Sequence, residues 1–276
     1  MLYQHKFIDY RSRAINACQR DSKALWSKLR SLLELKPSND STLAAEDLAQ
    51  YFTSKVSKTR ALTASSPPPH IEDRSVLKLL CALRPATVNE VATILKKLSA
   101  KHCQLDPAPT WLVKRAGDVL APVIAHMCNM SFALSKIPDH SKRAIVHPLL
   151  KTRTLDSNDP ALYRPISNLG FISKVVEKVV DDRLAAHTAR HKLLPTLQSA
   201  YHPNHSTETA VICILNDMIS VIDQGHIGAL MLLDLSAAFD TVDHQIFADV
   251  LRRWFGIAGG ALDWMVNFLS DRSQVV

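Results

Sequence analysis

The segment Gly228–Leu235 constrains the fold of this 276-residue chain more than any other stretch of it. Its sequence, GALMLLDL, is apolar throughout except for Asp234. A continuous apolar run of this length, opened by a glycine, is typical of a β-strand that is buried on both faces. Helices must cover such a strand, so the segment predicts an α/β arrangement with Asp234 near the carboxyl end of a buried strand.

Helices are predicted both before and after this strand in the sequence. Thr87 and Glu90 form a capping-box pair at the start of one helix, and residues 171–187 repeat apolar side chains at helical spacing. Ser206 and Asp243 are suitable N-caps for two later helices. Further helices are predicted over residues 24–35, 44–56, 111–134 (with a break or new start at Pro122) and 261–272, and a strand over 143–151.

Composition limits the class of protein. The formal charge is +7, which suits a polyanionic partner such as nucleic acid, although many basic proteins bind none. The five cysteines are scattered without a C-x-x-C pair, which argues against a disulfide framework or a zinc site and for a reducing compartment. No apolar run approaches about 18 residues. We therefore expect an intracellular protein, cytoplasmic or nuclear, with no membrane partner and of unknown oligomeric state.

Asp234 is the candidate functional residue. An acid at the end of a buried strand stands on a rigid support at a sheet edge, where ligands commonly dock in α/β folds. Its carboxylate could hold a hard cation such as Mg²⁺, and two such ions can activate a 3′-hydroxyl and stabilise a leaving pyrophosphate. On spacing alone, capping of the next turn is the commoner role of such an aspartate, and Asp240 and Asp243 are expected to be cap or turn residues.

Three sequence blocks carry a family resemblance. YRPISN (163–168), LQSAYHPNHSTETA (197–210) and LDLSAAFDTVDH (233–244) follow one another in this order. They resemble blocks of the reverse transcriptases of non-LTR (LINE-type) retrotransposons, the last one their first acidic motif. The resemblance runs from about Pro85 to Val276. It implies a helix-rich α/β (α+β) chain that contains part of a right-hand polymerase fold, the fingers and the first part of the palm.

The resemblance also implies a division of the chain. Residues 1–62 are expected to be a helical, basic connector, and residues 63–74 a linker rich in Pro and Ser. Residues 75–142 would be a helical N-terminal extension, and residues 143–276 the fingers and a truncated palm.

In this family, the acid that matches Asp234 is catalytic and binds the metal ions, expected to be Mg²⁺, with help from the carbonyl that matches Leu235. The ring that matches Phe239 lies under the incoming sugar and excludes a ribose 2′-hydroxyl; from the residues alone, a core phenylalanine fits equally well. The resemblance thus implies an RNA template, a DNA primer and dNTP substrates.

Other positions are expected to contact the substrates. Arg164 matches an arginine that binds the incoming triphosphate, for which its planar fork is suited, and Lys151 looks like its companion. Without the family, both would be solvated surface charges. Gln198, Ser206 and Thr207 match a block expected near the template strand, and Ser206 can also be a helix cap.

The chain departs from the family pattern in three ways. His202 stands where many relatives carry Arg, and Ala200 where they often carry Gly. The paired aspartates of a later family motif are absent, and Asp181–Asp182 are expected on the solvated face of a helix. The chain is therefore expected to be a truncated, marginally stable fragment without polymerase activity. The alternatives are a nucleic-acid-binding remnant without chemistry and a generic α/β interaction protein.

Overall fold

The computed structural model describes residues 42–67, 69–73, 79–101, 103–152, 155–235 and 238–276, with a few positions between 10 and 29. The chain forms two compact units, one of Met1–Leu48 with Pro148–Arg164 and one of Ala49–His147 with Pro165–Val276. The helix predicted over residues 24–35 lies largely outside the described residues. The four-part division based on the family resemblance stays a prediction.

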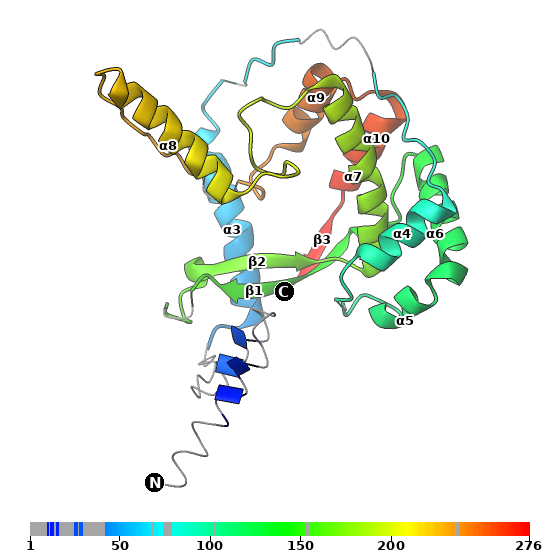
Figure 1. Ribbon diagram of the computed structural model, residues 1–276. Coiled ribbons are helices and arrows are strands. Elements are labelled where there is room, and N and C mark those ends of the chain that lie inside the picture. Colours follow the sequence, from blue (N-terminus) through cyan, green and yellow to red (C-terminus); the bar gives the residue numbers. More distant parts are fainter. Residues whose placement is uncertain are drawn as a thin grey trace, which may run out of the picture. The chain divides into compact units, whose positions relative to one another are not determined.

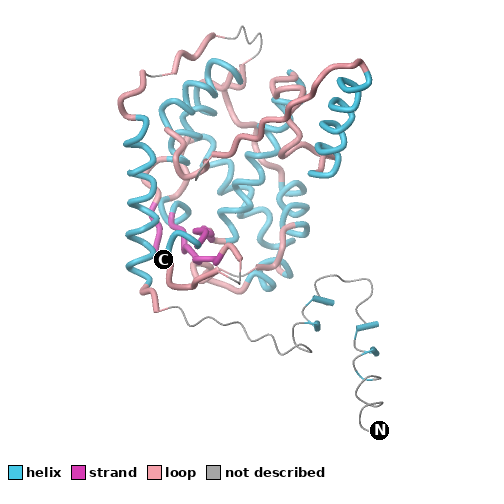
Figure 2. The backbone as a smooth tube through the Cα atoms, turned by 90° about the vertical axis from the view of Figure 1, so that its left-hand side faces the viewer, coloured by secondary structure: helices cyan, strands magenta, loops and turns pink. Residues whose placement is uncertain are grey.

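Helices dominate the described chain, and its strands gather in one small sheet (Figures 1 and 2). The helices are α3 (Ala45–Thr63), α4 (Val88–Lys97), α5 (Thr110–Arg115), α6 (Gly117–Ala133), α7 (Phe171–His191), α8 (Thr207–Asp223), α9 (His244–Phe255) and α10 (Gly259–Leu269), with short 3-10 helices at Asp139–Lys142 and Pro160–Leu162. The strands are β1 (Arg143–Leu150), β2 (Tyr163–Asn168) and β3 (Ser273–Val275). The predicted helix-rich α/β class is confirmed; the partial right-hand polymerase fold stays a prediction. No described helix is both long and apolar enough to cross a membrane.

The sheet has the order β2-β1-β3, with β1 and β3 parallel from Arg143↔Ser273 to Ile145↔Val275. The strand predicted over 143–151 is β1. Neither β2 nor β3 was predicted, because Pro165 removes a backbone donor from β2 and β3 is only three residues long. The edge position of β2 explains how it accommodates Pro165.

The hydrophobic core lies among α4, α6, α7, α9 and α10. Valines on one face of α7 are buried, as the helical spacing predicts: Val175, Val176, Val179 and Val180. Trp264 of α10 is 1% exposed and its indole N–H donates to Ser131 Oγ at 2.9 Å. The predicted cap pair is present, since the Thr87 side chain accepts from Glu90 N and the Glu90 side chain from Thr87 N.

The helix break predicted at Pro122 is wrong. The chain breaks earlier, at Ala116 between α5 and α6, and Pro122 lies inside α6. Proline lacks one donor and cannot make the bond of an interior residue, but it is tolerated when the rest of the helix is held by packing. Ala121, Ile124, Ala125 and Cys128 of α6 supply that packing.

The strand predicted over Gly228–Leu235 is also wrong. These residues have no regular secondary structure, and their apolar side chains are exposed, Leu232 by 81% and Leu233 by 86%. Alongside them runs α8, all of whose residues are at least partly exposed (Figure 1). A strand needs a neighbour for its backbone hydrogen bonds, and none of the described strands pairs with this segment.

Candidate active site

Asp234 lies in this irregular segment and is exposed. Its Oδ1 accepts a hydrogen bond from the backbone N–H of Leu235 at 2.9 Å, so the carboxylate binds its own neighbour rather than the start of a helix. Leu235 is also exposed. Within the described residues, no group of three or more His, Cys, Asp or Glu side chains could hold a metal ion. The carboxylate is accessible but is not joined by further acidic ligands there.

Phe239 follows in a turn and is 79% exposed, so it is not a core phenylalanine in this structure. Asp240 borders a cavity of about 190 Å³ that is also lined by Phe52 and Lys55 of α3 and Gln274 of β3. Asp243 is the N-cap of α9, as predicted, and accepts from Gln245 N at 2.9 Å and Ile246 N at 3.1 Å. These backbone bonds lower the pKa of Asp243, that from Ile246 most.

Helix α3 contacts the turn that leads from Asp240 into α9. The Arg60 guanidinium donates from Nη2 to the carbonyl oxygen of Val242 at 3.0 Å, next to the cap residue Asp243. Arg60 lies in the predicted basic connector, and no role was predicted for it. The only signal was the clustering of basic residues in a helical pattern, which does not reveal a contact 182 positions away.

Lys151 and Arg164 belong to the compact unit that contains Pro148–Arg164, whereas Asp234 belongs to the other unit. Lys151 directly follows β1, its backbone N–H donates to Leu162 O at 2.9 Å and its Nζ donates to Ala161 O at 2.8 Å. Arg164 is exposed in β2. Thus Lys151 is hydrogen-bonded to Ala161 and Leu162, which directly precede β2.

The predicted template residues lie around the start of α8. Ser206 is its N-cap, with a reciprocal pair of bonds to Thr209, so the capping role is confirmed. Thr207 is the first residue of the helix and is exposed. Gln198 lies in the preceding loop and donates from Nε2 to Ala200 O at 3.3 Å. The Ser206 hydroxyl also lowers the pKa of Glu208 by a hydrogen bond.

The Asp181–Asp182 pair lies on the solvated face of α7, as predicted. Both carboxylates are exposed and pair with Lys178, at 2.6 and 3.0 Å. These hydrogen bonds raise the pKa of Lys178. The pair is a surface ion-pair cluster and not a metal site.

Comparison with known proteins gives these residues a context. Residues 151–272, which include Lys151, Arg164, Gln198, Asp234 and Phe239, match the family described as reverse transcriptase (RNA-dependent DNA polymerase). Over these residues the chain is similar to the reverse transcriptase family. Helix α3 and the segments of α4 to α6 lie outside this matched domain.

Curated relatives extend the similarity beyond the matched domain. The chain is 23% identical over 201 residues to the "Probable RNA-directed DNA polymerase from transposon BS" of Drosophila melanogaster, covering 72% of this chain and 22% of that protein. It is 24% identical over 174 residues, 62% of this chain and 19% of the relative, to the "RNA-directed DNA polymerase from mobile element jockey" of the same organism. The "Probable RNA-directed DNA polymerase from transposon X-element" is 30% identical over 86 residues, 31% of this chain and 10% of that protein.

The resemblance to reverse transcriptases of non-LTR retrotransposons that the sequence blocks predicted is therefore confirmed. The chain spans about a fifth of the length of the first two relatives.

Proposed function

We propose that this chain is part of an RNA-directed DNA polymerase that copies an RNA template from a DNA primer with dNTPs. The observation that carries the proposal is the family match over residues 151–272, with Asp234 and Phe239 inside it. Members of this family generally use divalent metal ions, and we propose Mg²⁺ because oxygen ligands are the ones it prefers.

In this proposal Asp234 supplies a carboxylate, and Leu235 a carbonyl oxygen, to a catalytic metal. Both are exposed and their oxygens are the hard donors that Mg²⁺ requires. The described residues nevertheless do not fit a complete two-ion site, because a single carboxylate cannot fix two octahedral ions that also carry phosphate oxygens. We therefore assign Asp234 as one ligand and derive no reaction step through the metal.

The other residues position substrates. Arg164 and Lys151 contribute exposed cations to the incoming triphosphate, and the Arg164 fork can bind two phosphate oxygens at once. Phe239 presents an exposed ring that would occupy the space of a 2′-hydroxyl. Gln198, Ser206 and Thr207 lie close together in the chain, before and at the start of α8, and are proposed to contact the template.

The test uses the polypeptide encoded by the complete reading frame that contains these 276 residues. We expect it to extend a DNA primer on an RNA template with a divalent metal, and Asp234→Asn to reduce the rate by about 100-fold or more. Asp118→Asn, an exposed acid on α6, is the matched control and should retain the rate. Equal rates for the Asp234→Asn variant and the parent would contradict the assignment.

The 276-residue polypeptide alone is proposed to lack this activity, for want of further carboxylates beside Asp234. Primer extension by the purified 276-residue chain with Mg²⁺ would overturn this part of the proposal.

A second candidate function is nucleic-acid binding without chemistry. The net charge of +7 favours it, since cationic side chains displace the counterions of a polynucleotide. It differs from the first candidate in needing neither metal nor dNTP.

A further inference from the structure

A groove of about 420 Å³ lies between the segment 79–84 and the second half of α7. Its apolar surface includes Leu80, Ala82 and Ala186, and its charged side chains include Arg84 and Arg190. Residues 79–84 precede the domain matched by the family, whereas α7 lies within it. None of these residues belongs to the candidate active site.

Backbone hydrogen bonds fix the wall formed by residues 79–84. Leu80 N donates to Gly256 O at 2.8 Å, Ala258 N donates to Leu80 O at 3.0 Å, and Ala261 N donates to Cys81 O at 3.1 Å. Arg183 of α7 holds the end of the segment, donating from Nε to Arg84 O at 3.1 Å. The groove is therefore formed by segments that are already held together.

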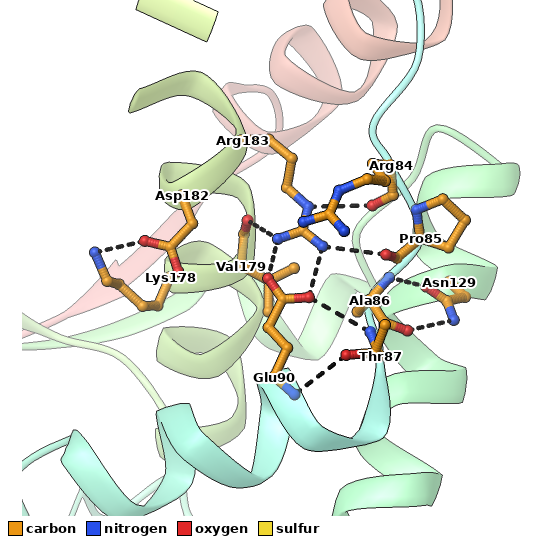
Figure 3. A network of polar contacts seen from close by, with 10 residues as sticks. All are labelled: Arg84, Pro85, Ala86, Thr87, Glu90, Asn129, Lys178, Val179, Asp182 and Arg183. Atoms are coloured by element: carbon orange, nitrogen blue, oxygen red, sulfur yellow. Dashed lines mark hydrogen bonds and ion pairs between the residues drawn. The ribbon is translucent and has the colours of Figure 1, made fainter. Parts of the chain in front are cut away.

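The groove carries an uncompensated positive charge. Arg183 is neutralised by Glu90, to which its Nη2 donates at 2.8 Å, and Asp182 is neutralised by Lys178 (Figure 3). Arg84 and Arg190 are exposed, and no described carboxylate forms an ion pair with either guanidinium. The side chain of Arg84 extends toward that of Arg183 in Figure 3, and both residues line the groove.

Two histidines, His187 and His191, also line the groove. His187 Nε2 lies 2.7 Å from Phe255 O, so the ring is held in place by α9. His191 packs edge-on against that ring, with centroids 5.0 Å apart. The groove thus combines two exposed arginines that form no ion pair with a described carboxylate, apolar side chains and two imidazole rings, and no unpaired acid is among the described residues that line it.

We propose that this groove binds phosphate groups of a polynucleotide strand. Guanidinium forks suit phosphate oxygens, and the apolar and ring surfaces of the groove suit the sugar and base that accompany a phosphate in a strand. The proposal gives the nucleic-acid-binding candidate a location, and it does not depend on polymerase chemistry.

The test measures the binding of fluorescein-labelled oligo(U) RNA to the 276-residue chain by anisotropy, over a series of NaCl concentrations and without metal or dNTP. For Arg84→Gln/Arg190→Gln we expect affinity at low salt to fall by roughly tenfold, because each exposed ion pair contributes up to about fivefold. The slope of log affinity against log salt should become shallower by about 0.7 for each lost contact with a single strand.

The matched control is Arg115→Gln/Lys136→Gln, which removes the same charge from exposed positions that do not line the groove. Equal losses of affinity and slope in the two double variants would overturn the proposal. Inorganic pyrophosphate separates the two sources of phosphate: at matched ionic strength we expect it not to displace the RNA beyond the salt effect. Selective displacement from the parent chain, but not from the groove variant, would instead make the groove a site for free phosphates and contradict the polynucleotide assignment.

Failure of this test leaves the polymerase proposal standing, because that proposal is tested by primer extension and by Asp234→Asn. Conversely, loss of primer extension would leave the RNA-binding result unaffected.

Discussion

Two regions of the compact unit formed by Ala49–His147 and Pro165–Val276 bury similar side chains to very different extents. In the packed region, formed by α4, α6, α7, α9 and α10, Ile94 is 6% exposed, whereas in α8 Ile212 is 63% exposed. Burial raises the pKa of the Cys128 thiol of α6 to about 11, while Cys213 of α8 is exposed. An apolar side chain is buried only where another element covers it. Helix α8 and Gly228–Leu235, the segment that bears Asp234, form the uncovered region, where no described element buries their apolar side chains.

Polar groups follow the same division. The packed region contains the Arg183–Glu90 ion pair, whose arginine also donates to the backbone oxygens of Val179, Arg84 and Pro85 (Figure 3). This pair lowers the pKa of Glu90, chiefly through the hydrogen bond from Arg183. In the uncovered region the polar contacts of Ser206 and Asp234 are local in sequence. Stability should therefore depend on the packed region far more than on the uncovered one.

The largest effect is expected from breaking the buried ion pair. Arg183→Met removes a guanidinium that is 4% exposed and leaves Glu90 without its partner. Loss of one member of a buried pair costs about 3–5 kcal/mol. Urea unfolding of the 276-residue chain, followed by circular dichroism, measures this loss.

Two controls make the result specific. Arg252→Met removes an exposed arginine whose partner is Asp249, and should cost less than about 1 kcal/mol. Glu90→Gln retains a side chain that can complete the capping box, so Arg183→Met/Glu90→Gln should cost less than the sum of the single changes. A cost for Arg183→Met no larger than that of Arg252→Met would refute the assigned role of the pair.

A smaller effect is expected from one isoleucine, and a negligible one from its counterpart. Ile94→Ala should destabilise the chain by about 2–4 kcal/mol, because it removes buried methyl groups and leaves a cavity. Ile212→Ala makes the same chemical change on an exposed face of α8 and should alter stability by no more than about 0.5 kcal/mol. The comparison uses urea midpoints at equal slope. A comparable loss of stability from Ile212→Ala would mean that α8 is covered in solution. The distinction between the packed and the uncovered region would then be wrong.

The same distinction explains which features the sequence predicted. The start of helix α9 was predicted, because the N-cap Asp243 is a local signal. The capping box of Thr87 and the N-cap role of Ser206 were predicted for the same reason. The strand prediction for Gly228–Leu235 was wrong because an apolar pattern shows only which side chains could be buried. A strand also needs a neighbouring strand to pair with.

The candidate site was predictable only in part. The family blocks located Asp234, Phe239 and Arg164 within the domain later matched at residues 151–272. They could not locate Arg60 or the groove beside Arg84, because both depend on contacts between segments about 100 or more positions apart. A local charge pattern does not distinguish a solvated cation from one that lies against a distant backbone oxygen.

The smallest effect is expected from a half-buried carboxyl group and depends on pH. Glu177 of α7 is half-buried, and no described group donates a hydrogen bond to its Oε1. Burial raises the pKa of Glu177 above its ordinary value of 4.5, and Arg272 and Lys174 offset only part of this rise. The folded protein therefore holds this proton more tightly than the unfolded chain, so stability falls as the pH rises from 4.5 through the raised pKa.

Glu177→Gln removes this penalty without changing the size of the side chain. We expect it to stabilise the chain at pH 7 by up to about 1 kcal/mol, and the gain to vanish once the pH falls below 4.5, where the native carboxyl group is itself protonated. Urea unfolding of the parent and the variant at both pH values measures the difference. Glu208→Gln, in the uncovered helix α8, is the matched control and should give no gain, because its pKa is lowered by the Ser206 hydroxyl rather than raised by burial. A gain from Glu177→Gln that persists unchanged in acid would show that the burial of its charge is not the cause, since a neutral carboxyl group carries no such penalty.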